Sequence, residues 1–320
     1  MNMTIGVDVG GTNIVCGATD GQGRVLRKLK RQTEAWAGHE AVLARIADMV
    51  EEIREALGND YRAVGVGVGV PGLVDPLAGV SKFAGNLKWR DVPVASLLER
   101  RIGLPVFIDN DVRMYVYGEA VSGAGRGYRH VLGITIGTGI AAAIVNGGEL
   151  YYGHQAMAGE IGHVRMDGVE EQCACGLSGC LETVASASGM VRQAKKALRA
   201  GRESLLAERF PGDELEKLTA ADLSQAMDDG DALASEILVR AGRLTGRALA
   251  AAAMVLSPDA IIVGGGGALA GERLLGPLRE ELYGLLLPDF REGLRVVTAE
   301  HNDDAGIIGS SLYAAYRNGA

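Results

Sequence analysis

Residues 4–18 read Thr4-Ile5-Gly6-Val7-Asp8-Val9-Gly10-Gly11-Thr12-Asn13-Ile14-Val15-Cys16-Gly17-Ala18, and this stretch decides the fold class. Residues 4–9 are typical of a strand, Gly10-Gly11-Thr12 of a turn, and residues 13–18 of a second strand. The plan partly recurs, because Gly137-Thr138-Gly139 separates the apolar segments 130–136 and 140–145. Two such hairpins in different halves of the chain indicate a duplicated domain with both turns facing one cleft.

The rest of the chain alternates predicted helices with predicted strands. Such alternation favours an α/β fold with a parallel or mixed sheet. Residues 63–70 alternate Val with Gly and end at Pro71-Gly72, which predicts a buried strand that delivers a loop. Further strands are expected at 105–108 and 260–263, and helices at 40–57, over most of 219–255 from a capping box at Thr219, and at 305–316.

Length and composition describe a globular enzyme. The chain has 320 residues, 48% of them apolar and 22% charged, which suits two domains or one large α/β unit. The formal net charge is −8 and no dense Lys/Arg stripe offsets it, so a nucleic-acid partner is not expected. The start carries no signal-peptide pattern, and the longest apolar run, 248–256, is far below the ~20 residues of a membrane span. Together with only four Cys, this predicts a reduced, cytoplasmic protein without a membrane partner.

The glycine turns are candidate phosphate-binding loops. Successive N–H groups in a turn without side chains can point at one anion, and Thr12 and Thr138 each add a hydroxyl. Asp8 precedes the first turn, where a carboxylate can hold Mg²⁺. A single loop of this kind is more often a plain hairpin, but two matched loops and a third glycine run at 264–267 favour phosphate binding. The chain has no Gly-x-x-x-x-Gly-Lys-[Ser/Thr] motif, so a P-loop enzyme is excluded.

An acidic cluster, Asp109-Asn110-Asp111, follows a predicted strand, where ligands of α/β sheets bind. Phosphoryl transfer to an alcohol needs a carboxylate that accepts the hydroxyl proton, and Asp111 can supply it. Asn110 can bond a neighbouring hydroxyl. The alternative for the same residues is an ordinary turn or helix N-cap.

Three of the four cysteines lie in Cys173-Ala174-Cys175-Gly176-Leu177-Ser178-Gly179-Cys180. Their C-x-C-x₄-C spacing lets three thiolates converge, and His163 is the nearest upstream histidine that can complete a tetrahedral zinc site. A disulfide between Cys173 and Cys175 is geometrically poor. Four protein ligands leave no open position, so a structural zinc is expected rather than a catalytic one. The fourth cysteine, Cys16, is expected to be a small core residue.

Taken together, these motifs resemble the ROK family of sugar kinases and related repressors, over nearly the whole chain. The resemblance rests on residues 8–12, 71–75, 85–89, Asn110-Asp111, 137–139, 264–267 and, most specifically, the segment from Ala158 through the cysteines to Glu182. It implies a two-domain actin-like ATPase (ribonuclease H-like) α/β fold with an interdomain cleft. The small domain is expected at 1–116, completed by a C-terminal helix at 305–320, and the large domain at 117–304, with the zinc segment at 163–180.

The resemblance also implies roles for individual residues. Asp111 is expected to be the general base. The sugar is expected to contact Asn86, Asn110, Asp111, Glu160, His163 and Glu182. ATP is expected at Asp8, Gly10, Gly11, Thr12, Asn13, Gly137, Thr138, Gly139, Gly264, Gly265, Gly266 and Gly267. The expected zinc ligands are His163, Cys173, Cys175 and Cys180, and zinc would position Glu160 and Glu182 around the sugar.

Two departures from the family pattern stand out. Residues 141–143 are all Ala where many relatives have Gly, which puts close backbone approach there in doubt. Arg113 stands where small residues are usual, so it is expected to alter the sugar pocket or an interface.

The predicted activity is ATP-dependent phosphorylation of a hexose 6-hydroxyl, with Mg²⁺, a structural Zn²⁺ and glucose as the first choice of sugar. Allose, fructose, mannose and N-acetylmannosamine are alternatives. A sugar-sensing repressor is a remote one, because Asp8 lies too near the start of this sequence to leave room for a preceding helix-turn-helix domain. A zinc-binding scaffold without catalytic turnover is a further alternative to the kinase. A homodimer or a dimer of dimers is the expected assembly.

Overall fold

The computed structural model describes residues 1–319, and the chain folds into two compact units. Unit 1 contains Met1–Arg129, Ala143–Ala158 and the C-terminal segment from Ala299. Unit 2 contains His130–Ala142 and Gly159–Thr298. The domain boundaries expected from the family resemblance stay a prediction.

Unit 1 is built on a five-stranded mixed sheet in the order β3-β2-β1-β4-β8. The strands β1, β2 and β3 are antiparallel neighbours, whereas β4 and β8 run parallel to β1. The predicted strands of the first hairpin and of residues 63–70 are confirmed within a few residues. The strand bounds are β1 (Asn2–Val9), β2 (Asn13–Thr19), β3 (Val25–Gln32), β4 (Arg62–Val70) and β8 (Val106–Asn110).

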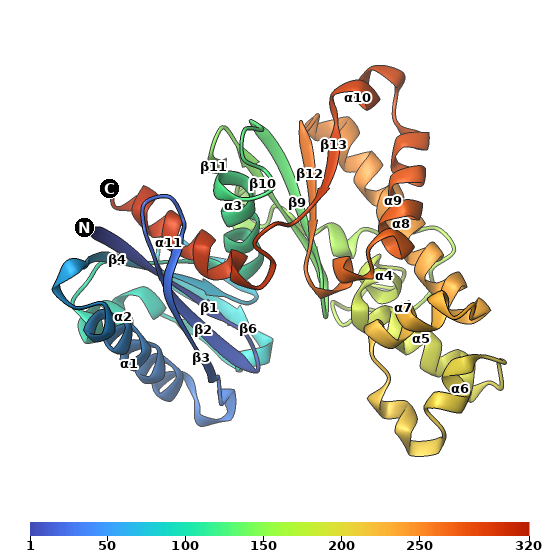
Figure 1. Cartoon of the computed structure of the whole chain (residues 1–320), viewed down its shortest axis with the longest axis horizontal. Coiled ribbons are helices and arrows are strands. Elements are labelled where there is room, and N and C mark those ends of the chain that lie inside the picture. The colour runs from blue at the N-terminus through green and yellow to red at the C-terminus, as the bar shows by residue number, and fades with distance from the viewer. Residues whose placement is uncertain (320) are drawn as a thin grey trace. The chain divides into compact units, whose positions relative to one another are not determined.

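The alternation of Val and Gly in β4 separates the two faces of this sheet. Helices α1 (His39–Leu57) and α2 (Val94–Ile102) lie on one face, and α3 (Asp111–Ser122) and α11 (Ala305–Arg317) lie on the other (Figure 1). The valines pack into the core that also contains the buried residues of α1. The glycines face α11, because a Cβ at Gly67 would overlap the Ser310 carbonyl of that helix. These glycines therefore serve close helix packing and not the approach of a ligand.

Helix α11 also lies unusually close to α3. A Cβ at Gly309 would overlap the backbone carbonyl of Met114, and Gly118 of α3 faces the backbone of α11 in the same way. The buried hydroxyl of Ser311 bonds Thr4 at 2.7 Å and Thr19 at 2.6 Å. The last described helix of the chain is thus packed against its first strands. Cys16 of β2 is fully buried, as expected.

A three-stranded antiparallel sheet, which sequence reasoning missed, follows β4. It has the order β5-β6-β7, with β5 (Leu73–Asp75), β6 (Val80–Ala84) and β7 (Trp89–Val92). Asn86 lies in the short 3-10 turn between β6 and β7. This small sheet therefore positions Asn86, one of the expected sugar contacts.

The second five-stranded sheet has the order β11-β10-β9-β12-β13. The strands β9, β12 and β13 are parallel, and β10 and β11 form an antiparallel pair. The predicted hairpin over residues 130–145 and the strand at 260–263 are confirmed. The boundary between the two units falls within β10, after Ala142. The strand bounds are β9 (His130–Ile136), β10 (Ile140–Asn146), β11 (Glu149–Leu150), β12 (Ala260–Gly264) and β13 (Arg295–Thr298).

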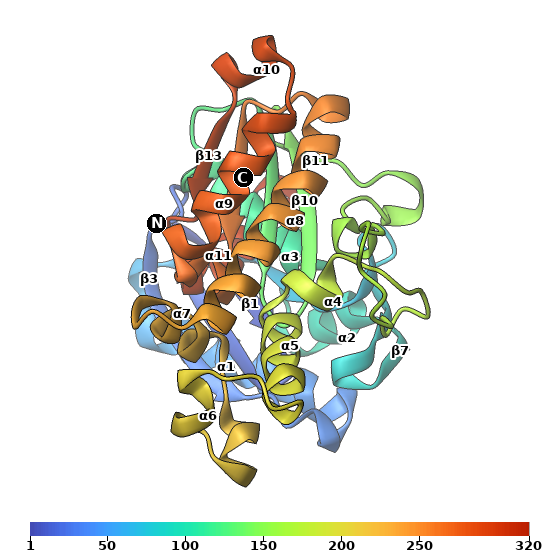
Figure 2. The ribbon, with the colours of Figure 1, turned by 90° about the vertical axis from the view of Figure 1, so that its right-hand side faces the viewer.

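Helices make up most of the rest of unit 2. The long helices α8 (Ala232–Leu256) and α9 (Glu272–Leu285) lie side by side (Figure 2). The predicted capping box is present, with Thr219 and Asp222 bonding each other's backbone N–H at the start of α7 (Ala220–Asp228). No helix of the described residues is long and apolar enough to cross a bilayer. The remaining helices are α4 (Glu182–Ala185), α5 (Ala187–Arg199), α6 (Leu205–Arg209) and α10 (Pro288–Gly293).

Candidate active site and metal centre

The acidic cluster forms the corner between β8 and α3. Asp109 and Asn110 are the last residues of β8, and Asp111 is the first residue of α3. The Asn110 Oδ1 atom accepts hydrogen bonds from the backbone N–H groups of Val112 and Arg113, at 3.0 and 3.1 Å. The N-cap alternative for this cluster is therefore correct for Asn110. Its amide nitrogen donates to the Gly72 carbonyl at 3.0 Å, and its side chain also hydrogen-bonds Asp111.

Asp8 lies on β1 and Asp111 directly after β8, the two strands that flank β4 in unit 1. Asp8 pairs in register with Gly69 of β4, and a Cβ at Gly69 would lie 3.3 Å from the Asp111 Cα. Burial, and then the charge of Asp111, raise the pKa of Asp8 to about 7. Burial also raises the pKa of Asp111, although a hydrogen bond from the Val112 backbone opposes the shift. Two crowded carboxylates of this kind suit a proton or a divalent cation.

The first glycine turn is closed by its own backbone. The Gly10 N–H donates to the Asn13 carbonyl at 2.9 Å, and the Thr33 hydroxyl donates to the Gly10 carbonyl at 2.6 Å. Gly11 and Thr12 are exposed at the tip of the turn. A Cβ at Gly11 would lie 3.3 Å from the Cβ of Asn86. Unit 1 thus brings a candidate phosphate turn and a candidate sugar contact together.

The second glycine turn, in unit 2, is tied to Glu182. The Glu182 Oε2 atom accepts a hydrogen bond from the Ile140 N–H at 2.9 Å, and a Cβ at Gly139 would overlap the same oxygen. On the other side of the turn, the Ala187 N–H donates to the Gly137 carbonyl at 2.9 Å, and the Ser188 hydroxyl bonds the Thr138 carbonyl. The turn is therefore held by the segment that follows the cysteines.

The third glycine run lies at the end of β12 and lines a small pocket within unit 2. This pocket has a volume of about 190 Å³ and is bounded by Gly266, Gly267 and side chains of α5, α7, α8 and α9. Its polar groups include Ser224 and Gln225 of α7. Sequence reasoning missed these two residues, because the capping box predicted α7 but gave no sign of which element its polar face meets.

The predicted zinc ligands come together in unit 2. The ligand atoms of His163, Cys173, Cys175 and Cys180 all lie within 4.8 Å of one another. The His163 Nδ1 atom is 3.7 Å from the Cys173 sulfur, and the sulfurs of Cys175 and Cys180 are also 3.7 Å apart. Ligands at about 2.3 Å from a tetrahedral zinc are separated by about 3.8 Å, so these four residues fit that ion.

The geometry also distinguishes the two ring nitrogens of His163. Its Nδ1 atom faces the sulfur cluster, and its Nε2 atom lies 3.7 Å from a carboxylate oxygen of Glu160. A metal at Nδ1 leaves Nε2 as the protonated nitrogen, which can donate toward Glu160 or a ligand. The histidine thus connects the cysteine cluster with one of the expected sugar contacts.

The predicted site residues fall into two groups, one in each unit. Unit 1 holds a group around the first turn and the β8–α3 corner, and unit 2 holds a group around the second turn, the cysteines and the third glycine run. At the three alanines after Ile140, the Ala142 N–H donates to the Gly159 carbonyl at 2.8 Å, and their effect on a ligand stays a prediction. A Cβ at Gly162 would overlap the Ile140 carbonyl, so the glycine that permits this contact lies on the opposing segment.

The architecture is that of a mixed α/β protein with two five-stranded sheets. It matches the structure of a ROK family glucokinase from Streptomyces griseus in complex with glucose and AMPPNP, with a TM-score of 0.83 and 34% identity over 98% of this chain and 99% of that one. The model of the ROK family matches residues 4–316, and the chain belongs to this family. Its fold is the actin-like ATPase fold, as expected.

Two further relatives cover nearly all of this chain. The glucokinase of Thermotoga maritima is 36% identical over 98% of both chains. A ROK family transcriptional regulator, a homologue of the E. coli MLC protein, is 26% identical with a TM-score of 0.85 over 97% of this chain and 77% of the regulator. Kinases and regulators therefore share this fold, and the site residues have to distinguish the two functions.

Proposed function

We propose that the protein is an ATP-dependent sugar kinase that transfers the γ-phosphoryl group of ATP to the 6-hydroxyl of a hexose, with glucose as the first candidate. The observation that carries the proposal is the pair Asp8 and Asp111, which lie on or directly after the two strands that flank β4, with Asp8 directly before the first glycine turn. The names of the glucokinases at 34–36% identity support a sugar kinase and favour glucose.

In the proposed reaction, Asp111 accepts the proton of the sugar hydroxyl as that oxygen attacks the γ-phosphorus. A pKa raised by burial brings this carboxylate closer to neutral pH, where a general base works best. The Asn110 side chain bonds a neighbouring sugar hydroxyl. The N–H groups and hydroxyls of the two glycine turns bind phosphate oxygens. Mg²⁺, when bound with ATP, neutralises phosphate charge, and Asp8 is the residue that would hold it.

The sugar contacts in unit 2 depend on the cysteine cluster. Zinc held by His163 and the three cysteines would fix the segment that carries Glu160 and Glu182. Its role is structural, because four protein ligands leave no position for a substrate. The thiols of such a site are maintained in a reducing compartment, which fits the predicted cytoplasmic location. The homodimer stays a prediction that the molar mass in solution would test.

The direct test is a coupled assay of ADP release over a panel of sugars. The panel contains glucose, allose, fructose, mannose, N-acetylglucosamine and N-acetylmannosamine, with 6-deoxyglucose as the matched control. We expect turnover with glucose and none with 6-deoxyglucose, which lacks the acceptor oxygen. ADP release with another sugar of the panel and none with glucose would identify that sugar as the substrate. Turnover of 6-deoxyglucose would exclude the 6-hydroxyl as the phosphoryl acceptor.

The regulator remains the second candidate because a solved ROK regulator shares the fold. A sugar sensor without catalysis would bind a sugar of this panel and release no ADP with any of them. Isothermal titration calorimetry beside the kinetic assay separates the two functions.

A further inference from the structure

Arg113, which was expected to alter the sugar pocket or an interface, is buried in unit 1 and bridges two segments of the chain. It is 5% exposed, and its partner Asp109 is fully buried. The Arg113 Nε atom donates to Asp109 Oδ1 at 2.6 Å, and one terminal nitrogen donates to the Ala156 carbonyl at 2.8 Å. One guanidinium thus connects the β8–α3 corner with the segment that follows β11. It does not merely alter the surface of a pocket.

Asp109 is held from a second side by Tyr152. The Tyr152 hydroxyl donates to Asp109 Oδ2 at 2.8 Å and lies 3.0 Å from the Tyr313 hydroxyl of α11. The guanidinium carbon of Arg113 lies 5.4 Å from the centre of the Tyr152 ring. The Asp109 Oδ1 atom also accepts a hydrogen bond from the Asn110 N–H at 2.6 Å. The position of Asp109 therefore constrains the backbone of Asn110, which directly precedes Asp111.

The segment that Arg113 holds has a strained backbone. Gln155 and Ala156 have φ angles of 53° and 56°, so two consecutive residues with side chains are in the left-handed region. Each such residue costs about 1 kcal/mol or more and persists only when its surroundings impose it. The hydrogen bond from Arg113 to the Ala156 carbonyl is a contact of this kind.

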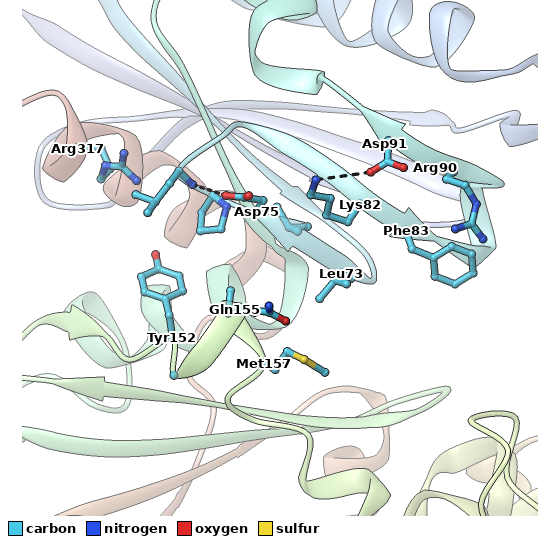
Figure 3. Close-up of a pocket in the computed structure, with 15 residues that line it drawn as sticks. Leu73, Asp75, Lys82, Phe83, Arg90, Asp91, Tyr152, Gln155, Met157 and Arg317 are labelled. Carbon is cyan, nitrogen blue, oxygen red and sulfur yellow. Dashed lines mark hydrogen bonds and ion pairs between the residues drawn. The ribbon is translucent and has the colours of Figure 1, made fainter.

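The other side of this segment lines a large pocket of unit 1. The pocket has a volume of about 750 Å³, and Gly153, Gln155, Ala156 and Met157 form part of its wall. Figure 3 shows Tyr152, Gln155 and Met157 on this side of the pocket, across from Leu73 and Asp75 of the small sheet. Because this face of the segment borders open space, the hydrogen bond from Arg113 to the Ala156 carbonyl is a main support of the segment. The chain then continues through Ala158 and Gly159 to Glu160.

We propose that Arg113 is a positioning residue for the sugar site: it holds the strained segment 153–156 against the β8–α3 corner and so sets both the backbone of Asn110 and the start of the segment that carries Glu160. The inference rests on the proposed function and deepens it, because it concerns how the sugar contacts are placed. The basis is the bridge between Asp109 and the Ala156 carbonyl.

The test compares Arg113→Lys with Arg101→Lys in the whole chain. Lysine keeps a positive charge beside Asp109 but lacks the planar fork that reaches Asp109 and Ala156 together. Arg101 of α2 is a matched control in unit 1, because it also bonds a carboxylate and a backbone carbonyl, both of Glu40 in α1, with 3.2 Å to the carbonyl. The readouts are hydrogen exchange of the amides of residues 153–158, the KM for sugar and for ATP, kcat, and Tm.

For Arg113→Lys we expect faster amide exchange over 153–158 and a KM for sugar raised about tenfold, with the KM for ATP changed less than about twofold. Arg101→Lys should change none of these three quantities. Tyr152→Phe removes the hydroxyl and keeps the ring, and it should give the same selective rise in the KM for sugar. It takes the place of Arg113→Lys in the test if that variant folds poorly.

Two results would overturn the inference. One is unchanged exchange and unchanged sugar KM in an active Arg113→Lys enzyme. The other is an equal rise of both KM values together with a lower Tm, which a purely structural role would produce. If the wild-type protein phosphorylates no sugar, the proposed function fails, whereas the exchange measurement still shows whether Arg113 holds the segment.

Discussion

The Glu182 carboxylate accepts a 2.9 Å hydrogen bond from the Ile140 N–H and occupies the space that a side chain at Gly139 would need. Glu182 stands two positions after Cys180, one of the four clustered metal-ligand residues. One side chain therefore connects the second glycine turn with the cysteine segment. A change at the turn is expected to be felt at the proposed sugar site through this contact.

Gly139→Ala tests that connection. The new Cβ would overlap Glu182 Oε2, so the carboxylate has to move and its hydrogen bond to Ile140 is lost. A charged hydrogen bond contributes about 1.5–3 kcal/mol, so we expect a lower Tm and a higher KM for sugar. Gly137→Ala is the control for stability, because nothing lies within 4 Å of a Cβ at that position. Equal Tm values of the two variants in thermal unfolding would contradict the role of Glu182.

Asp111→Asn tests the general base. The amide keeps the shape of the side chain but cannot accept the hydroxyl proton, so kcat should fall by about 10²–10⁴. The KM for ATP should change little. Asp289→Asn is the control, because Asp289 is also an acidic residue in the first turn of a helix, α10, and is exposed. Steady-state ADP release measures both. Near-normal kcat in Asp111→Asn would exclude this residue as the base.

Metal content tests the cysteine cluster. We expect about one zinc per chain by elemental analysis, and much less in Cys175→Ser, which leaves three of the four ligands. The KM for sugar should rise in this variant, because Glu160 and Glu182 flank the cluster in the sequence. Cys16→Ala, in a strand of unit 1, should keep its zinc. An equal zinc content in both variants would show that the metal is bound elsewhere.

The raised pKa of Asp8 predicts how the stability of the protein depends on pH. Its folded-state pKa of about 7 lies above the ordinary value of 3.8, so the unfolded chain releases the proton first as pH rises. The protonated side chain contributes stability below about pH 4, and this contribution is lost as pH rises to about 7. Asp8→Asn should therefore raise Tm at pH 8 and change it less at pH 5, in buffer free of magnesium and nucleotide.

Asp20→Asn provides the control of opposite sign. Slight burial raises the pKa of Asp20, but hydrogen bonds from the backbone of Arg24 and Gln22 outweigh it and lower the pKa. The ionised Asp20 carboxylate stabilises the fold above the pKa of the unfolded chain, so Asp20→Asn should lower Tm at pH 8. This fall in Tm should become smaller as the pH drops below 4. A rise of Tm at pH 8 in both variants would indicate a general charge effect and contradict the assignment to Asp8.

Much of the fold was predictable because its signals are local. The Val and Gly alternation before Pro71 predicted β4, and the capping box at Thr219 predicted the start of α7. The small sheet β5-β6-β7 was missed, because its strands of three to five residues are too short for a clear period. The strand before Asp111 was predicted to end two residues too early, because Asp and Asn in sequence are more typical of turns than of strand ends.

The candidate site was also predictable where its signals are local in sequence. The spacing of Cys173, Cys175 and Cys180 alone indicates a metal site, because ligands that are close in sequence converge through local turns. The pocket wall formed by Ser224 and Gln225 was not predictable, because it depends on α7 meeting the glycines after β12. The role of Asn110 in capping α3 was one of two alternatives, and only the backbone geometry decided between them.

By itself the sequence determined the family, the strands of both glycine-turn hairpins, and the convergence of His163 with three cysteines. The tertiary structure decided which glycines serve packing, as Gly67 does against Ser310, and that Arg113 bridges Asp109 and the Ala156 carbonyl. It also decided that Glu182 contacts the turn at Gly139. The physical reason is that helical period, capping and ligand spacing act over a few residues, whereas these contacts join segments that meet only when the sheets and helices have packed.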